Sequence, residues 1–184
     1  MVGNALFSST LRACGFADAR IGYSRTVFAR PTDYVIRSLT PEDEPILWEM
    51  LYHGLSEPAV HKPASREILR RPEISKYVAG WGRVGDVGFV AHEKKGGGLI
   101  GAVWLRQPTG ISGVVPELAL AVKQEHRGHG IATALLTQLV RANPDQSTIS
   151  IRFVAGKPVL RLYERFGFKV IAQQRDAVVM QRQT

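Results

Sequence analysis

The sequence predicts a mixed α/β (α+β) domain in which a mixed central sheet is flanked by helices. Three observations support this class. Segments with strand and helix periodicity alternate along the chain from Tyr34 onward. The glycine-rich turn at residues 94–98 joins two apolar segments and predicts an antiparallel hairpin. Further on, strand, helix and strand signals follow one another in the order of a βαβ unit.

The first elements have clear boundary signals. Tyr34–Ser38 alternates apolar and polar residues and predicts a strand. Thr40 is placed to cap a helix and Pro41 to occupy its first position. The apolar stripe of that helix is Ile46, Leu47, Met50 and Leu51. Residues 52–64 are predicted to form a loop. Ser65–Leu69 and Glu73–Val78 predict a helix that is interrupted at Pro72.

The remaining elements follow from periodicity and composition. Strands are predicted at Val87–Glu93, Leu99–Arg106, Glu117–Val122, Thr148–Val154, Phe168–Ala172 and Ala177–Gln181. Helices are predicted at Ile131–Arg141 and Val159–Phe166. Gly167 is expected to end the second of these in a left-handed cap.

Length and composition exclude several classes of protein. The chain has 184 residues, of which 45% are hydrophobic and 22% charged, so one globular domain is expected. Cys14 is the only cysteine, which excludes an intramolecular disulfide and a four-cysteine zinc site. The five histidines lack the spacing of a helical zinc site, so we expect no metal. No apolar run is long enough to span a bilayer, and no membrane partner is expected.

Residues 1–33 differ from the rest of the chain. They are rich in Arg, Ser and Ala and poor in acids, and they lack clear periodicity. We expect a flexible N-terminal extension, with an organellar targeting segment as the alternative. The domain is then assigned to residues 34–184, and a cytoplasmic location is expected.

The net charge of +8 is concentrated in the last third of the chain. Residues 123–184 hold ten basic against four acidic side chains, whereas residues 34–122 are balanced. This asymmetry indicates an anionic partner, which by charge alone is a phosphorylated cofactor, a nucleic acid or a membrane surface.

A glycine-spaced turn opens the helix at Ile131. It reads Arg127-Gly128-His129-Gly130-Ile131-Ala132. Glycines let the backbone approach a ligand closely, and a helix N-terminus offers unpaired N–H groups, so the turn predicts a phosphate or pyrophosphate site. The residues fit neither a Walker P-loop, which needs Gly-Lys-Ser/Thr, nor a Rossmann turn, because Thr133 replaces its third glycine. An ordinary strand-to-helix connection is the alternative.

Two motifs in order resemble the GNAT acetyltransferase superfamily. Arg127, Gly130 and Ala132 match its Q/R-x-x-G-x-G/A signature, and Leu162–Phe168 resembles its Leu-Tyr-x-x-x-Gly-Phe segment. The resemblance extends over residues 34–182. It implies acetyl-CoA as co-substrate, with its pyrophosphate on the turn and its pantetheine arm along the strand Leu118–Val122. The implied cofactor-binding residues are Leu120, Ala121, Val122, Arg127, Gly128, His129, Gly130, Ile131, Ala132, Thr133 and Lys157.

The same resemblance implies N-acetylation by direct attack of a primary amine in a ternary complex. Glu117 is the candidate general base, and a charge in solvent at a strand end is its alternative. Tyr163 is the candidate acid for the leaving thiolate, and a core tyrosine is its alternative. A backbone N–H near Leu120 is the candidate oxyanion donor. His129 is expected to contribute its N–H with the ring exposed.

One position departs from the family pattern. The superfamily often places Asn six or seven residues before the tyrosine, where this chain has Lys157 and Gly156. Lys157 is then a candidate contact for a CoA phosphate. Two alternatives to the acetyltransferase are therefore kept: a non-catalytic CoA-binding or regulatory module, and a transferase for another acyl-CoA or an O-linked acceptor. A basic nucleic-acid binder is a third hypothesis, although no basic-aromatic array supports it. The expected acceptor is an amine-bearing small molecule, peptide or protein. A homodimer is kept as an open alternative for the oligomeric state.

Overall fold

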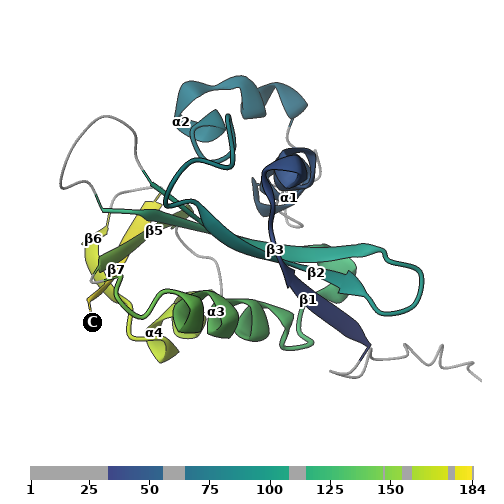
Figure 1. Cartoon of the computed structure of the whole chain (residues 1–184). Helices are drawn as coiled ribbons and strands as arrows, with labels where there is room; N and C mark the ends of the chain where they lie inside the picture. The colour runs from purple at the N-terminus through teal and green to yellow at the C-terminus, as the bar shows by residue number, and fades with distance from the viewer. Residues whose placement is uncertain are drawn as a thin grey trace, which may run out of the picture.

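A seven-stranded sheet runs through the molecule, with its strands in the order β1-β2-β3-β4-β5-β7-β6. The computed structural model describes residues 33–55, 65–107, 115–146, 148–154, 159–173 and 177–183. Helix α1 and the segment made of η2 and α2 lie over one face of the sheet, whereas α3 and α4 lie over the other (Figure 1). The predicted class, a mixed sheet flanked by helices, is confirmed.

Most elements begin and end close to their predicted positions, but the segment before β2 differs. Helix α1 continues to Leu55, into the predicted loop, and the predicted broken helix is a 3-10 turn followed by a short helix that begins at Pro72 and ends at Ser75. The strands are β1 (Tyr34–Ser38), β2 (Val87–Glu93), β3 (Leu99–Arg106), β4 (Glu117–Val122), β5 (Thr148–Val154), β6 (Lys169–Gln173) and β7 (Ala177–Gln183). The α-helices are α1 (Glu44–Leu55), α2 (Pro72–Ser75), α3 (Ile131–Ala142) and α4 (Leu160–Arg165). The 3-10 turns are η1 (Pro41–Asp43), η2 (Arg66–Arg70) and η3 (Gln124–His126). No helix in the described ranges is long and apolar enough to cross a membrane.

The pairing divides the sheet into two parts. Strands β1 to β4 pair antiparallel in chain order, as the hairpin signal predicts. Strand β4 then pairs parallel with β5 across the connecting helix α3, which is the predicted βαβ unit. Strand β7 lies between β5 and β6 and is antiparallel to both. At the β6 edge the register shifts between Val170 and Ala172, so Ile171 is an extra residue in that strand.

Apolar side chains fill both faces of the sheet. One cluster lies between the sheet and α3 and α4, and it includes Leu118, Leu135 and Tyr163. The other lies under α1 and includes Leu47, Met50 and Trp104. The alternation of β4 serves both clusters, because Leu118, Leu120 and Val122 contact the first whereas Ala119 and Ala121 contact the second.

The start of α1 is fixed by an ion pair in addition to the predicted cap. The backbone N–H of Thr40 donates to Asp43 Oδ2 at 2.8 Å, and Arg37 donates to both Asp43 oxygens at 2.7 and 2.8 Å. The hydrogen bonds from Arg37, with those from Thr40, hold the pKa of Asp43 well below its usual range. Asp43 therefore ties β1 to η1, the 3-10 turn that leads into α1.

We predict that Asp43→Ala lowers the free energy of unfolding by about 1.5–3 kcal/mol, because Arg37 and Thr40 lose a charged acceptor. Urea denaturation measures the change, and Glu42→Gln, at the exposed neighbouring acid, is the control. Since the folded-state pKa of Asp43 is depressed, its contribution is present above the unfolded value of about 3.9 and is lost as the pH falls below it. Equal losses in the two variants would contradict this assignment.

Candidate active site

Strands β4 and β5 begin side by side and then part. They pair only at Glu117 with Ser150 and at Leu118 with Ile151. Beyond Leu118 the structure contains, among the residues it describes, no strand partner for β4 on the side of β5. In open sheets with parallel strands, ligands bind where the carboxyl ends of neighbouring strands diverge. This parting is therefore the candidate site.

The register shows which backbone groups face the parting. The N–H of Lys123 donates to the Ile100 carbonyl of β3 at 2.9 Å, and the N–H of Ser150 in β5 donates to the Pro116 carbonyl at 2.8 Å. Odd-numbered residues of β4 thus direct their backbone groups to β3 and even-numbered residues direct theirs to β5. The N–H and C=O of Leu120 and the N–H of Val122 consequently face the parting; these are the two residues to which the family resemblance assigns the pantetheine arm.

The glycine turn lies at the end of β4 and opens α3. Gly128 and Gly130 have φ of +80° and +79°, in the left-handed region that favours glycine. A Cβ added at either position would meet no atom within 4 Å, so the turn is open in front. Gly130 is the N-cap of α3 and no side chain caps the helix. The first N–H groups of α3 therefore have no side-chain cap, and the predicted anion site lies in front of them.

Arg127 holds the turn from behind. Its Nε donates to the carbonyl of Val122 at 2.9 Å, and its Nη2 donates to the carbonyl of His53 near the end of α1 at 3.3 Å. Nearby, Lys123 forms an ion pair with Glu49 of α1 at 2.8 Å. Two of the basic side chains in the last third of the chain thus bind the protein itself and join the turn to α1.

Tyr163 lies in the core that α3 and α4 cover. Its side chain is 3% exposed and its ring packs against Phe153 and Phe168, with centroids 5.6 and 5.7 Å away. Burial raises the pKa of the Tyr163 phenol above its usual range. Gly167 ends α4 with φ +84° and Phe168 N–H donates to the Tyr163 carbonyl, which is the predicted left-handed cap.

Glu117 has partners that the sequence does not predict. Lys76 Nζ, one residue after α2, lies 2.7 and 2.8 Å from the two carboxylate oxygens. Tyr77 also bonds to Glu117, and burial together with that bond raises the pKa of the Tyr77 phenol above its usual range. The Glu117 carboxylate is therefore held by two partners, although its side chain is 30% exposed.

The two candidate catalytic side chains lie on opposite faces of the sheet. Glu117 pairs with Arg106, whose side chain bonds to the segment after α2, so it faces the α1 and α2 side. Tyr163 lies among the side chains of the α3 and α4 side. The two faces of the sheet are connected where β4 and β5 part.

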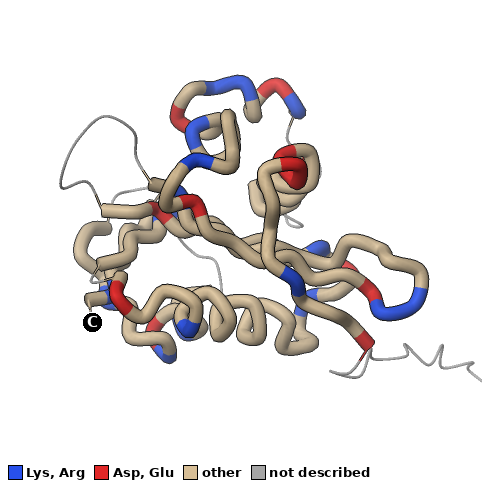
Figure 2. The backbone as a smooth tube through the Cα atoms, in the orientation of Figure 1, with Lys and Arg blue, Asp and Glu red and all other residues tan. Residues whose placement is uncertain are grey.

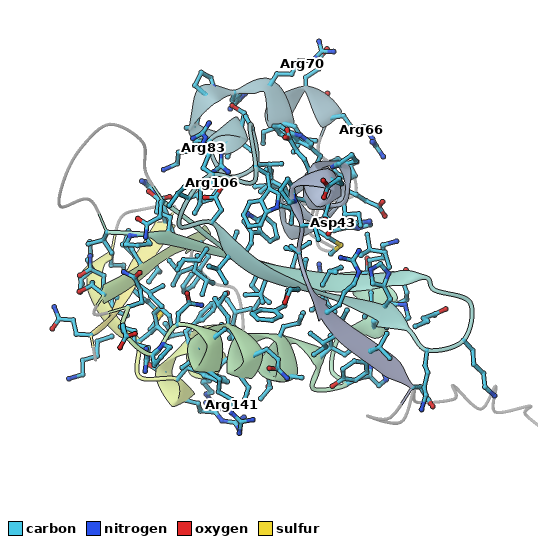
Figure 3. The ribbon with its side chains drawn as sticks, viewed as in Figure 1. Asp43, Arg66, Arg70, Arg83, Arg106 and Arg141 are labelled. Atoms are coloured by element: carbon cyan, nitrogen blue, oxygen red, sulfur yellow. The ribbon has the colours of Figure 1, made fainter. Side chains whose placement is uncertain are left out.

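A buried ion pair fixes the segment after α2, which contacts Glu117. Arg106 is 4% exposed, and its Nη1 lies 2.5 Å from Asp86 Oδ2. Arg106 also donates to the carbonyls of Lys76, Ala79 and Gly80 (Figure 3 shows it next to the segment of Arg83). Asp86 in turn accepts from the N–H groups of Gly82 and Arg83. This network fixes the residues that follow α2, and the sequence does not predict it.

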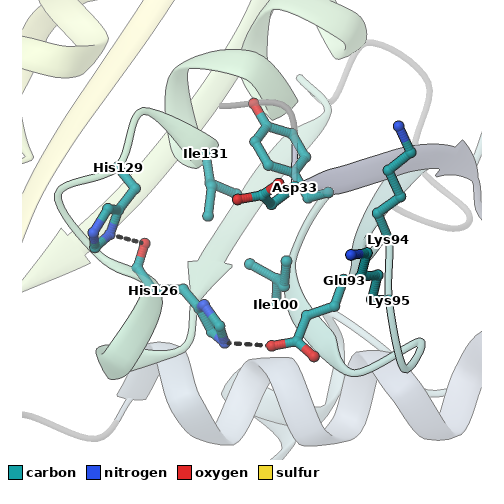
Figure 4. A pocket seen from close by; sticks show the side chains of 9 residues that line it. Asp33, Glu93, Lys94, Lys95, Ile100, His126, His129 and Ile131 are labelled. Atoms are coloured by element: carbon teal, nitrogen blue, oxygen red, sulfur yellow. Dashed lines mark hydrogen bonds and ion pairs between the residues drawn. The ribbon is translucent and has the colours of Figure 1, made fainter. Parts of the chain in front are cut away.

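A pocket of about 380 Å³ lies beside the turn, between α3 and the β2–β3 hairpin (Figure 4). His129 lines it, half-buried, with Nδ1 3.2 Å from the His126 carbonyl. The prediction of an exposed ring is therefore wrong, because the ring folds back on its own turn. His126 Nε2 lies 3.8 Å from Glu93 Oε1 across the same pocket.

The other predicted residues are placed as follows. Ala121 lies on β4, and Ile131, Ala132 and Thr133 lie in the first turn of α3. The side chains of Ala121, Ile131 and Ala132 pack into the two apolar clusters. Lys157 lies outside the described residues. Within those residues no group of three His, Cys, Asp or Glu side chains could hold a metal ion. Lys and Arg are found on both helix layers and at the hairpin tip, interspersed with acids (Figure 2).

Comparison with known proteins adds a family match to this geometry. Residues 85–170 match the acetyltransferase (GNAT) domain family. No curated protein matches the sequence.

Several solved structures share the fold. An N-acetyltransferase, paia, from Thermoplasma acidophilum, solved with coenzyme A, is 18% identical, with a TM-score of 0.61 over 83% of this chain and 99% of that one. A putative acetyltransferase, yncA, from Salmonella typhimurium, solved with its cofactor acetyl-CoA, is 18% identical, with a TM-score of 0.58 over 83% and 94%. The ribosomal-protein-alanine N-acetyltransferase of Brucella melitensis is 20% identical, with a TM-score of 0.56 over 82% and 99%.

We predict that Asp86→Asn lowers the free energy of unfolding by about 3–5 kcal/mol, because it leaves the buried Arg106 guanidinium without a counter-charge. Urea denaturation measures the loss. Asp145→Asn, at an exposed position, is the matched control and should change it by less than about 0.5 kcal/mol. Similar losses of unfolding free energy in the two variants would show that the Arg106–Asp86 pair does not stabilise this segment.

Proposed function

This chain carries a GNAT acetyltransferase domain, and on that premise we propose that it transfers an acetyl group from acetyl-CoA to a primary amine. We assign the domain to residues 34–184. The observation that carries the proposal is the parting of β4 and β5 after Leu118, directly before an uncapped helix N-terminus behind Gly128 and Gly130. The acceptor is an amine on a small molecule, a peptide or a protein.

The donor side of the site fits a linear thioester with a diphosphate. The N–H groups of residues 128–132 would hold the diphosphate, helped by the positive end of the α3 dipole. Leu120 and Val122 would bind the amides of the pantetheine arm as a further strand would, through the backbone groups that face the parting. Arg127 keeps the turn in place for this contact through its bonds to β4 and α1.

Three residues would divide the chemical work. Glu117 takes the proton of the attacking amine, directly or through water. The N–H of Leu120 stabilises the negative charge on the carbonyl oxygen as the bond to nitrogen forms. Tyr163 gives a proton to the departing thiolate. Because burial raises its pKa, the phenol stays protonated throughout the neutral range.

The placement of these groups supports a direct transfer in a ternary complex. The amine would approach from the α1 and α2 side, where Glu117 is held, and the thiolate would leave on the Tyr163 side. No covalent enzyme intermediate is required, because both partners meet where β4 and β5 part. A protein that only binds CoA would keep the donor site but show no thiol release.

We predict that Gly130→Ala weakens CoA binding at least about tenfold, because its methyl group would occupy open space at the turn that the diphosphate is proposed to fill. Gly97→Ala is the matched control: Gly97 also has a positive φ, of +67°, and open space around its Cβ position, but it lies in the β2–β3 hairpin. Both variants carry a similar backbone cost of about 1–2 kcal/mol. Calorimetric titration with CoA checks this, and equal affinities in the two would contradict the assigned site.

We predict that Tyr163→Phe slows acetyl-CoA-dependent thiol release at least about tenfold while CoA affinity is kept. The phenyl ring preserves the packing against Phe153 and Phe168, so the melting temperature should change little. Activity of the native protein should not fall as the pH rises toward about 10, because the Tyr163 pKa lies above this ordinary value. An unchanged rate in the variant would remove Tyr163 from the acid role.

A further inference from the structure

An amine of the chain itself already occupies the candidate base. Lys76 Nζ donates to both oxygens of Glu117, at 2.7 and 2.8 Å, from a residue 41 positions away in sequence. The two side chains are 48% and 30% exposed, so the pair lies at the protein surface and is open to reactants. Its geometry is that of a primary alkyl ammonium bound by a carboxylate, which is the arrangement that the proposed reaction requires of its acceptor.

Contacts to its backbone and to its side chain fix the position of Lys76. Its carbonyl accepts from Arg106 Nε at 3.3 Å, and the next carbonyl, of Tyr77, accepts from Trp104 Nε1 at 2.9 Å. The Lys76 ammonium also lies 4.9 Å from the centroid of the Tyr77 ring, which attracts a cation. Two buried side chains thus fix the backbone, while a ring and a carboxylate guide the amine.

We propose that Lys76 is an acetylation site of this protein, modified in cis by its own acetyl-CoA. This rests on the proposed function, in which Glu117 receives the proton of the attacking amine. Glu117 takes one proton from the Lys76 ammonium, and the neutral Nζ attacks the thioester carbonyl carbon. The C–N bond forms, the C–S bond breaks, and CoA leaves as a thiolate to which Tyr163 gives a proton. The nitrogen loses its second proton as the amide forms, which balances the proton that Tyr163 gives, and the proton held by Glu117 passes to solvent. Lys76 becomes Nε-acetyl-lysine.

Acetylation would change the site as well as the residue. An acetylated lysine carries no charge, so it cannot maintain the ion pair with Glu117 or the contact with the Tyr77 ring. Glu117 would then be available to an external amine. Until that happens, Lys76 competes with any acceptor for the same carboxylate.

The test follows acetylation residue by residue in the full chain. The protein is incubated with acetyl-CoA and no added amine, and peptide mass spectrometry measures the rate at each lysine. Lys94 and Lys95 report chemical acetylation by the thioester, because both are exposed in the hairpin. We expect Lys76 to react at least about tenfold faster than either, because a bound donor raises the effective concentration. The first-order rate should not change with protein concentration, as expected of reaction within one chain.

Two variants separate the mechanism from mere exposure. Glu117→Gln should slow acetylation of Lys76 at least about tenfold and leave Lys94 and Lys95 unchanged. Lys76→Arg should abolish the fast event and keep a cation beside Glu117. A Lys76 rate equal to those of Lys94 and Lys95, or a rate that rises with protein concentration, would overturn the proposal.

The failure of this inference is distinguishable from that of the proposed function. If native protein and Lys76→Arg both release thiol with a panel of external amines while Lys76 stays unmodified, only the cis acetylation is wrong. If CoA gives no heat in calorimetry and no amine releases thiol, the proposed function fails and the inference fails with it.

Discussion

Two strands that start as neighbours and then part leave backbone N–H and C=O groups that require partners. The structure meets this constraint between β4 and β5, where pairing ends at Leu118. Buried backbone groups are almost always hydrogen-bonded, so a parting of this kind is maintained for a ligand or for solvent. The rest of the molecule keeps the two strands apart: β5 is held by β7 along its whole length, and β4 by β3. Helix α3 connects the pair and brings its N-terminus to the end of β4.

The supports on the two sides of the parting differ in kind. On the side proposed to bind the donor, backbone geometry dominates, with two glycines at positive φ and an arginine that binds carbonyls of β4 and α1. On the side proposed to bind the acceptor, charges dominate. The Arg106–Asp86 pair holds the segment after α2, and that segment carries Lys76 to Glu117. This contrast is consistent with the proposed reaction, in which the donor is constant and the acceptor varies.

The sequence predicts the elements well because their signals are local. Strands β2 to β5 begin and end where alternation, turns and β-branched runs indicate, and Gly167 ends α4 as expected. The turn at Gly128 and Gly130 can also be predicted from sequence, since left-handed glycines before an apolar helix are a short-range pattern. The structure tests the placement of these residues, whereas their roles toward acetyl-CoA stay predictions.

The partners of Glu117 and Arg106 could not be predicted from local patterns. Lys76 is 41 residues from Glu117, and Asp86 is 20 from Arg106, so only the folded sheet brings them together. One signal is present for the second pair: Arg106 ends a strand whose other residues are all apolar or glycine. A charged side chain at the end of such a buried run needs a counter-charge, and Asp86 stands in the turn before the neighbouring strand.

The bulge in the edge strand β6 affects the tendency of this chain to aggregate at high protein concentration. A straight outer strand bearing Val170 and Ile171, which are 46% and 54% exposed, would offer a ladder onto which further chains could polymerise. The extra residue at Ile171 breaks the even spacing of donors and acceptors there. Because a bulge disfavours pairing with a further strand, we expect this edge to resist fibril growth although apolar side chains are exposed on it.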